Sequence, residues 1–395
     1  MFQRSKFAPR SLAVVSAATL LLAACGGGGG SDAPTGSLKL ALVDAPACGY
    51  DHVYVTVESV KVHQSASAGE NDPGWYTITL PGLPKRIDLL ELRNGLLQEL
   101  GQTALPAGRY TQMRLILSSN SSTPYANAVT PTGGLETELT TPSAQQSGLK
   151  LNVDIEIEAG KLADFVLDFD ACKSVVKAGN SGKYNLKPVI AVLPRVIDGM
   201  AVDGYLANYS PYASVSLQLN GVVVRSTVPD PLRQGYFALP YLPGSGTNYD
   251  LVITDPVSGT RVVTAVPVSP TAVTEVSTAA QPITLSASSS QGLSASATAG
   301  NAIPDAIISV HQDLGGGKEI ELASLPVDSE LGTASFRLAT APVQLASYPL
   351  SQPQQWTSYN ASAAQFSVRS SVPGTAPQSQ TVNLGSEPAS VNFSY

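Results

Sequence analysis

Apolar residues recur at every second position in several short segments of this chain. In the stretch LNVDIEIE, Val153, Ile155 and Ile157 alternate with three acidic residues. The same period of two runs through residues 38–42, 53–62, 113–117 and 165–169. Successive side chains of a β-strand point to opposite faces, so this alternation predicts half-buried strands.

Turn-forming residues are abundant in the chain, and helical patterns are rare. The 395 residues include 34 glycines and 29 prolines, and residues 86–101 are the stretch that places leucines at helical spacing. Strand patterns separated by turns, with little helix, are typical of β-sandwiches. The sequence therefore predicts an all-β protein with two or three antiparallel β-sandwich domains in tandem.

Two irregularities add detail to this prediction. In residues 53–62, the valines at every second position slip by one residue near Glu58–Ser59, which predicts a β-bulge. In residues 86–101, Asn94–Gly95 interrupts the leucines at helical spacing. One or two short helical turns are therefore expected there.

The first residues have the features of a secretory signal. Thirteen mostly apolar residues, Leu12–Ala24, follow the basic residues Arg4, Lys6 and Arg10. A membrane-spanning helix needs about 20 residues, so this run is too short to span but suits the apolar core of a signal peptide. Its end, Leu-Ala-Ala-Cys at residues 22–25, resembles the bacterial lipobox. An ordinary signal peptide with a chance cysteine is the alternative.

The lipobox resemblance implies a lipid anchor at Cys25. It implies a diacylglycerol thioether on this cysteine, cleavage before it, and acylation of the new amino terminus. Several acyl chains hold a protein firmly to a membrane, and the glycines at 26–30 would form a flexible tether. Gly26 rather than Asp follows the cysteine. By resemblance to the sorting rule of Gram-negative lipoproteins, this favours the outer membrane, with the body facing the periplasm or the cell surface.

The two halves of the chain differ in charge. Residues 1–198 contain 35 charged side chains and residues 199–395 contain 18. This change predicts a domain boundary near residue 198. The predicted order is signal peptide, lipidated cysteine with tether, and three β-domains, at residues 1–24, 25–36, 37–197, 198–284 and 285–395.

Several segments of the first predicted domain resemble a known family. The stretches SLKLALVDAPACGYDHVYVTVESVKVH, RIDLLELRNG, LPAGRYTQMRLIL and LADFVLDFDACKSVV occur in this order within residues 37–195. Together they are similar to a family of bacterial lipoproteins known as domain of unknown function 4382. The resemblance implies a secreted β-sandwich-like domain, and it brings no activity and no catalytic residues.

The second predicted domain contains three strand motifs, ASVSL at 213–217, GYFAL at 235–239 and YDLVI at 249–253. These motifs resemble the carboxypeptidase regulatory-like domain, a small transthyretin-like sandwich, which implies a spacer or a binding module. The third predicted domain repeats this plan weakly, with Phe336–Leu338 and Phe366–Val368 in the corresponding order.

Cys48 and Cys172 are the two cysteines that remain once Cys25 is acylated. In an oxidising compartment two such thiols usually pair, and each follows the end of a predicted strand. We therefore predict a Cys48–Cys172 disulfide. Two lone cysteines without CxxC spacing are poor zinc ligands.

Four carboxylates lie close in sequence to these two cysteines. The disulfide would bring them together, and oxygen ligands at a loop junction suit Ca²⁺, the one cofactor considered. In the alternative interpretation, Asp44 caps a turn before Pro46 and the other carboxylates face water. The calcium candidates are Asp44, Asp51, Asp168 and Asp170.

No catalytic constellation stands out in the sequence. His52 and His63 flank one predicted strand and lie up to about 35 Å apart, so they are not expected to share a metal. No nucleophile-elbow motif GxSxG occurs. The sequence therefore predicts a non-catalytic envelope lipoprotein for binding, adhesion or structure, with the membrane and an unknown protein or glycan as partners. The alternative is a hydrolase or metal-dependent enzyme with its site in 37–197.

The net charge and the aromatic residues in predicted loops indicate which classes of partner the chain is expected to bind. The net charge is −7 and no basic run occurs, so nucleic acid is not an expected partner. Aromatic residues in predicted loops could stack on sugars, or they could pack in a core or an interface. These residues are Trp75, Tyr76, Trp356 and Tyr359.

Overall fold

The computed structural model describes residues 34–395 except 45–48, 79–81, 83, 122, 142–146, 196–198 and 245. Strands dominate these residues, and helix is limited to α1 (Ala171–Ser174) and three 3₁₀ turns. The all-β prediction is confirmed. Within the described part, no helix is both long and apolar enough for a membrane span. The predictions for the signal peptide, Cys25 and Cys48 lie outside the described residues, and so does the predicted tether segment 25–36 up to residue 33. Its last two residues, Thr35 and Gly36, begin strand β1.

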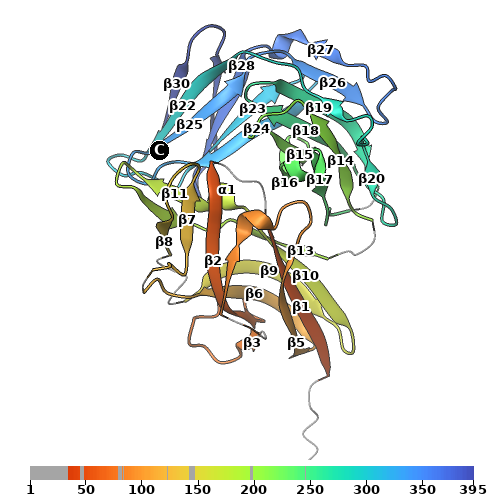
Figure 1. Cartoon of the computed structure of the whole chain (residues 1–395). Helices are drawn as coiled ribbons and strands as arrows, with labels where there is room; N and C mark the ends of the chain where they lie inside the picture. The colour runs from red at the N-terminus through yellow and green to blue at the C-terminus, as the bar shows by residue number, and fades with distance from the viewer. Residues whose placement is uncertain are drawn as a thin grey trace, which may run out of the picture. The chain divides into compact units, whose positions relative to one another are not determined.

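Pro34–Tyr395 forms one compact unit, in which we distinguish three bodies of strands. Body A, orange to yellow-green in Figure 1, has two sheets. The first has the order β13 (Ile190–Pro194), β10 (Leu162–Phe169), β1 (Thr35–Asp44), β5 (Gln98–Pro106). The second has the order β11 (Val175–Ala178), β12 (Lys183–Leu186), β8 (Thr137–Thr140), β7 (Ala128–Pro131), β2 (Tyr50–His63), β6 (Gly108–Leu117), β9 (Leu149–Ile157). Two short strands also pair with β2, namely β3 (Tyr76–Ile78) and β4 (Lys85–Asp88).

Body B follows in the chain and also has two sheets. The smaller consists of β17 (Tyr236–Leu239), β14 (Val202–Ala207), β20 (Thr274–Glu275) and β21 (Ile283–Thr284). The larger has the order β16 (Val222–Thr227), β15 (Ser214–Leu219), β18 (Asn248–Asp255), β19 (Gly259–Pro267), β26 (Val343–Ser347), β27 (Thr357–Tyr359). The 3₁₀ turn η2 (Pro231–Arg233) precedes β17.

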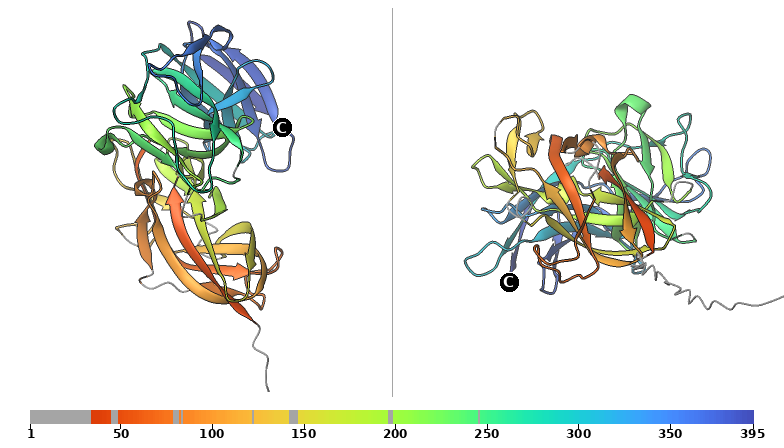
Figure 2. Two further views of the ribbon diagram at one scale, coloured as in Figure 1. Left: turned by 90° about the vertical axis from the view of Figure 1, so that its right-hand side faces the viewer. Right: turned by 90° about the horizontal axis from the view of Figure 1, so that it is seen from below.

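Body C, drawn in blue-green to blue, completes the unit (Figure 2). Its sheets have the orders β25 (Thr333–Ala339), β22 (Ser290–Thr298), β30 (Ala389–Ser394) and β24 (Glu319–Pro326), β23 (Ile307–Asp313), β28 (Gln365–Ser371), β29 (Gln378–Asn383). The turn η3 (Asn360–Ser362) precedes β28. Strands β26 and β27, which lie within the sequence range 285–395, belong to the sheet of body B. The domain boundaries themselves stay predictions.

The alternating segments form strands with the predicted buried faces. Ile155 and Ile157 of β9 are fully buried, while Asp154 and Glu156 are exposed. The pairing of β2 with β6 shifts register between Val57 and Ser59, so the predicted bulge is confirmed. One of the predicted helical turns is also present, as the 3₁₀ turn η1 (Leu89–Glu91).

Strand β1 differs from the simple alternating picture because both of its faces are buried. Leu38, Leu40 and Leu42 face the main core of body A, as predicted. Ala41 and Val43 are buried as well, in a small second cluster that includes Tyr241 of body B. The outer face of this strand is therefore covered by the neighbouring body.

Strand direction is a second difference. The sheets are largely antiparallel, but β1 pairs with β10 in parallel, and so do β19 with β26 and β22 with β30. A period of two reports which face of a strand is buried and is the same for both directions. The parallel pairs join strands far apart in the chain, so local patterns did not predict them.

Specific contacts hold the bodies together. Val252 and Val262 of body B pack with Ile320 of body C in one buried cluster. Asn94 of body A, at φ 57°, accepts hydrogen bonds through Oδ1 from Thr227 Oγ1 at 2.9 Å and from Ala238 N at 3.0 Å. The Asn94–Gly95 turn thus docks body A on body B.

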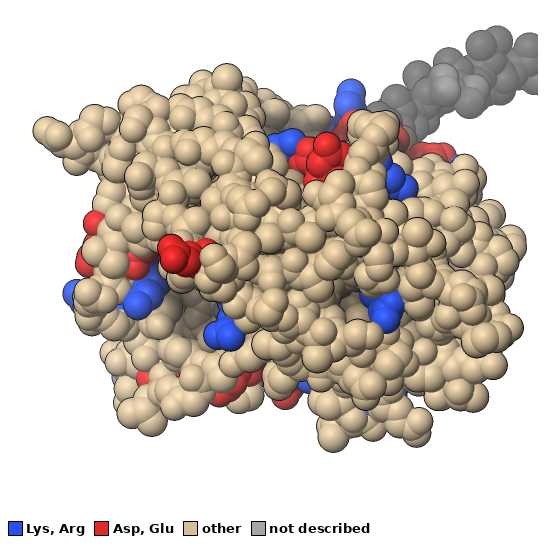
Figure 3. Space-filling view, turned by 90° about the horizontal axis from the view of Figure 1, so that it is seen from above, with Lys and Arg blue, Asp and Glu red and all other residues tan. Residues whose placement is uncertain are grey.

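Charged side chains are sparse on the surface, as they are in the sequence. Figure 3 shows a face on which Lys, Arg, Asp and Glu are few and scattered, and on which no large basic patch gathers. Nothing on this face suits the phosphate backbone of a nucleic acid.

Candidate functional site

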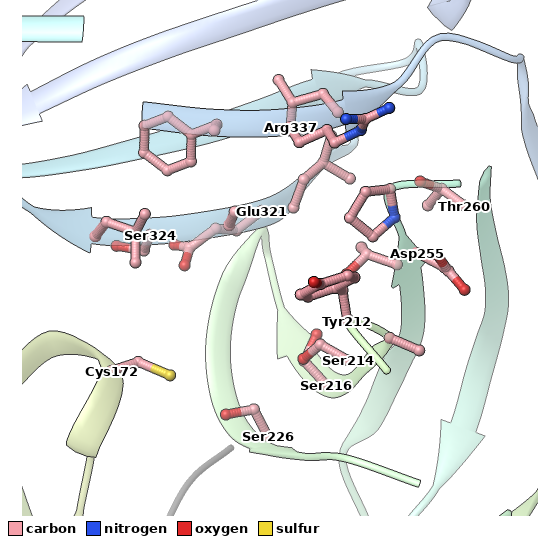
Figure 4. A pocket seen from close by; sticks show the side chains of 18 of the residues that line it. Cys172, Tyr212, Ser214, Ser216, Ser226, Asp255, Thr260, Glu321, Ser324 and Arg337 are labelled. Carbon is pink, nitrogen blue, oxygen red and sulfur yellow. The ribbon is translucent and has the colours of Figure 1, made fainter. Parts of the chain in front are cut away.

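A cavity of about 570 Å³ lies where bodies A, B and C meet (Figure 4). Strands β15, β16 and β18 of body B form one wall, and β24 and β25 of body C form another. The start of α1 and Gly49 contribute from body A. The cavity is therefore built by segments from all three bodies.

The wall from body B carries a group of hydroxyl side chains. In the register of the sheet, Ser216 lies opposite Ser226 and Ser214 lies opposite Thr254. Val215 and Leu217, which alternate with these residues in β15, are fully buried in the core of body B. The strand thus presents its polar face to the cavity, which explains why these hydroxyls gather there.

Several of these hydroxyls have no partner within the described part of the chain. Ser216 accepts a hydrogen bond from Gln218 at 3.0 Å. The side chains of Ser214, Ser226 and Ser324 form no such bond with any described residue. All three are half-buried. Half-buried hydroxyls facing a cavity are available to bond a polar ligand or water.

Charged groups of bodies A and C face the cavity from the other sides. Burial raises the pKa of Glu321, on β24, to about 6, and Lys173 of body A opposes this rise. Lys173 Nζ lies 3.1 Å from Asp170 Oδ2. Burial alone would lower the pKa of Lys173, but Asp170 and Glu321 outweigh it and raise this pKa. Among the described residues, the cavity therefore holds a paired lysine and one carboxylate, that of Glu321, without a bonded cation.

Tyr212 stands at the cavity with 66% of its surface exposed. Its backbone N–H donates to Ser210 Oγ, at 3.2 Å. The hydroxyl of Ser210 in turn donates to Asp255, at 2.8 Å, and the Ser210 N–H donates to the same carboxylate, at 2.6 Å. Asp255 is 1% exposed, so this carboxylate holds the turn that presents the tyrosine ring.

The predicted carboxylate cluster is partly brought together. Asp170 lies on the cavity wall and caps α1, accepting from Lys173 N at 3.0 Å. Asp168 forms an ion pair with Arg225 of body B. Asp51 accepts from Gly133 N at 3.0 Å. Asp44 ends β1 opposite Phe169.

Metal ligation is not apparent in this arrangement. Across the described ranges, no group of three or more His, Cys, Asp or Glu side chains is placed to hold a metal ion. Asp51, Asp168 and Asp170 each have another partner within the chain. The calcium site stays a prediction.

A second cavity, of about 1000 Å³, lies between bodies B and C and contains a serine–histidine–glutamate arrangement. His311 Nε2 is 2.8 Å from Ser309 Oγ, and His311 Nδ1 is 2.8 Å from Glu319 Oε1. However, His311 Nδ1 and Glu319 Oε1 are not aligned for a hydrogen bond. Glu319 also pairs with Arg369 at 2.6 Å, and burial lowers the pKa of His311 to about 4. A general base needs a pKa near the working pH, so the group does not suit proton transfer.

The remaining predicted residues have structural contacts. His52 Nδ1 lies 2.5 Å from Asp88 Oδ2, and His63 Nε2 lies 3.1 Å from Pro73 O. Trp75 packs against His63, with ring centres 5.0 Å apart. Trp356 lies under Arg261 and packs against the core of body B. These tryptophans follow the packing alternative.

Comparison with known proteins gives one family match. Residues 35–188 match DUF4382, described as a domain of unknown function. The match covers most of the first predicted domain, 37–197, and supports the resemblance to that family. The description of this family assigns no activity. No curated protein matches the chain.

The solved structures that match this chain share little sequence identity with it and have low TM-scores. A leucine-rich repeat protein from Bacteroides thetaiotaomicron has 10% identity and TM-score 0.16, covering 64% of this chain and 27% of that protein. The major pilin SpaA of Corynebacterium diphtheriae has 10% identity, TM-score 0.20 and coverage of 91% and 99%. A putative adhesin from Bacteroides ovatus has 9% identity, TM-score 0.17 and coverage of 92% and 93%. TM-scores this low support no argument about function.

Sequence reasoning missed most of the cavity. Tyr212, Lys173, Glu321 and the hydroxyls of β15 and β16 were not singled out. One signal was available, because ASVSL at 213–217 alternates serine with apolar residues where a surface strand more often carries charge. The other walls come from Asp170–Lys173, about 40 residues before β15, and from β24 and β25, about 100 residues after it, and no local pattern reports such contacts.

Proposed function

We propose that this chain is a non-catalytic binding module, held at the bacterial outer membrane by lipid on Cys25. We further propose that its ligand site is the cavity where bodies A, B and C meet, named the junction cavity. The observation that carries the proposal is the cavity itself. A space of about 570 Å³, in which the hydroxyls of Ser214, Ser226 and Ser324 have no partner among the described residues, falls in the size range of small-molecule sites, about 300–1,000 Å³.

The cavity is more than a gap between loosely joined bodies. Its walls are fixed by contacts around it, including the Arg225–Asp168 ion pair between bodies A and B. Between bodies A and C, Asp328 accepts a hydrogen bond from Gly179 N, at 2.8 Å. A site held on all sides loses little entropy when a ligand binds.

The proposed Cys48–Cys172 disulfide would close the cavity wall on the side of body A. Asp44 pairs with Phe169 in the sheet, so the two cysteines follow paired residues by four and three positions. Gly49, the neighbour of Cys48, lines the same cavity as Cys172. These positions support the pairing, which remains a proposal.

The anchor supports the proposal from the sequence side. The predicted tether leads directly into β1 of body A. Body B, by its resemblance to the carboxypeptidase regulatory-like domain, is proposed to serve as a spacer and as one wall of the site. The enzyme alternative has no comparable support, since the serine–histidine–glutamate group lacks a suitable base.

Replacing Cys25 by serine is expected to abolish palmitate labelling and leave unprocessed precursor, because the thioether needs the thiol. Metabolic labelling followed by membrane fractionation measures this. Cys172→Ser is the control and should be labelled and processed like the natural chain. Labelling of Cys25→Ser at the natural rate would contradict the anchor.

Filling the cavity is expected to remove a bound molecule. The full-length chain purified from envelopes in detergent should carry a non-covalent ligand in native mass spectrometry, and Ser226→Phe should carry none. Thr381→Phe, at an exposed strand position of body C, is the control and should keep the ligand. A natural chain without any bound mass, or equal loading of Ser226→Phe, would refute the proposed site.

A further inference from the structure

The proposed function does not specify the chemical class of the ligand. The side chains that line the cavity indicate which class of ligand fits. Resting on that proposed function, we propose that the junction cavity binds a short neutral oligosaccharide. In this arrangement one sugar ring stacks on Tyr212, and Ser214, Ser226, Ser324 and Glu321 bond its hydroxyl groups.

The hydroxyl wall argues for a ligand with many hydroxyl groups of its own. Each serine hydroxyl can donate one hydrogen bond and accept two. An apolar ligand would cover Ser214, Ser226 and Ser324 and leave them unpaired, at a cost for each buried group. Since these serines come from bodies B and C, a ligand that satisfies them needs polar groups on two sides.

The charges in the cavity argue against a strongly charged ligand. Lys173 is already paired with Asp170 at 3.1 Å. Arg337 is exposed and donates to Ser290 at 2.8 Å. Arg337 keeps its positive charge, since Ser290 is neutral, but this side chain is exposed. Glu321 is the more deeply buried charge without an ion pair among the described residues, and its carboxylate would repel an anionic ligand. A carboxylate that accepts from sugar hydroxyls forms charge-assisted bonds, which are stronger than neutral ones.

Tyr212 supplies the apolar contact that sugars require. One face of many sugar rings is formed by C–H groups, and an aromatic ring offers a flat apolar surface with a polar tip. The ring is exposed although tyrosine has much apolar surface to bury. Its turn is fixed by the buried Asp255, so the ring is presented in a set position before any ligand arrives.

The experiment measures binding of maltotriose, cellotriose and N,N′,N″-triacetylchitotriose to the full-length chain by calorimetry. At least one should bind, and Tyr212→Ala should weaken that binding by about tenfold or more, which is the effect of losing one stacked ring. Tyr212→Phe keeps the ring and should bind like the natural chain. Glu321→Gln keeps the shape but loses the charge and should bind more weakly.

The outcomes distinguish a failure of this inference from a failure of the proposed function. If native mass spectrometry finds a cargo that Ser226→Phe loses, but none of the three probes binds, the site stands and the sugar class is wrong. Tighter binding of trigalacturonate than of any neutral probe would also overturn it. If a probe binds and Tyr212→Ala binds it equally well, the ligand does not lie at this tyrosine and the inference fails.

Discussion

Replacing Asp168 by alanine is expected to reduce the free energy of unfolding by about 3–5 kcal/mol, the largest stability effect of any single substitution proposed for this chain. The carboxylate of Asp168, on β10, pairs with Arg225 on β16. The Arg225 side chain is 3% exposed. Without Asp168, a guanidinium would remain buried between bodies A and B with no opposite charge.

The two partners are not equivalent. Burial raises the pKa of Asp168, and Arg225 opposes that rise. A carboxyl group can therefore take up a proton when its partner is lost, whereas an arginine in a protein stays charged. We expect Arg225→Met to cost less than Asp168→Ala, and its cost should decrease at acidic pH.

Urea unfolding of the single and double variants measures this asymmetry. The double variant Asp168→Leu/Arg225→Met should recover most of the loss, because well-packed apolar residues often replace a buried ion pair without cost. Asp154→Ala breaks an exposed bidentate pair with Arg109 and should change little. Equal losses for Asp168→Ala and Asp154→Ala would show that the junction does not depend on the buried pair.

The ion pair also shows what sequence could and could not predict. In DFVLDFD, the alternation correctly placed Leu167 and Phe169 in the core. The same alternation suggests that Asp168 faces water. It faces Arg225 instead, because body B covers that side of the sheet. Period-two patterns report one buried face per strand and cannot report a second body packed on the other.

Glu321 was missed for the same reason. The stretch EIELASLP has a fully buried Ile320 between two acids, which is typical of a surface strand. In the structure, β24 of body C lines the cavity that it shares with bodies A and B. Glu321 therefore faces the cavity, close to Lys173. By contrast, the bulge in β2 was predictable because its signal lies within a few neighbouring residues.

The second large effect concerns acid stability and centres on His311. This side chain is 5% exposed. It faces Ser309 on its own strand, Glu319 and Glu321 on β24, and Arg369 on β28. Burial, with a contribution from Arg369, lowers its pKa from 6.5 to about 4. The folded chain thus keeps this imidazole neutral over a range in which the unfolded chain protonates it.

The sign of the effect follows from proton binding. Between pH 6.5 and 4 the unfolded state takes up a proton at this position and the folded state does not, so stability falls as pH falls. A pKa change from 6.5 to about 4 corresponds to about 3 kcal/mol once the titration is complete. Glu321 acts in the opposite direction. Its pKa is raised to about 6, so protonation between pH 6 and 4.5 stabilises the folded state by about 2 kcal/mol.

These opposing titrations predict that the two substitutions change the acid profile in opposite ways. His311→Gln removes the acid-sensitive group, so its stability relative to the natural chain should improve by about 3 kcal/mol between pH 7.5 and pH 4. Glu321→Gln should instead be favourable at pH 7.5 and lose that advantage towards pH 4. Urea unfolding of both variants across this range measures both effects. Parallel profiles for the natural chain and His311→Gln would mean that His311 takes up its proton in the folded state as readily as in the unfolded one.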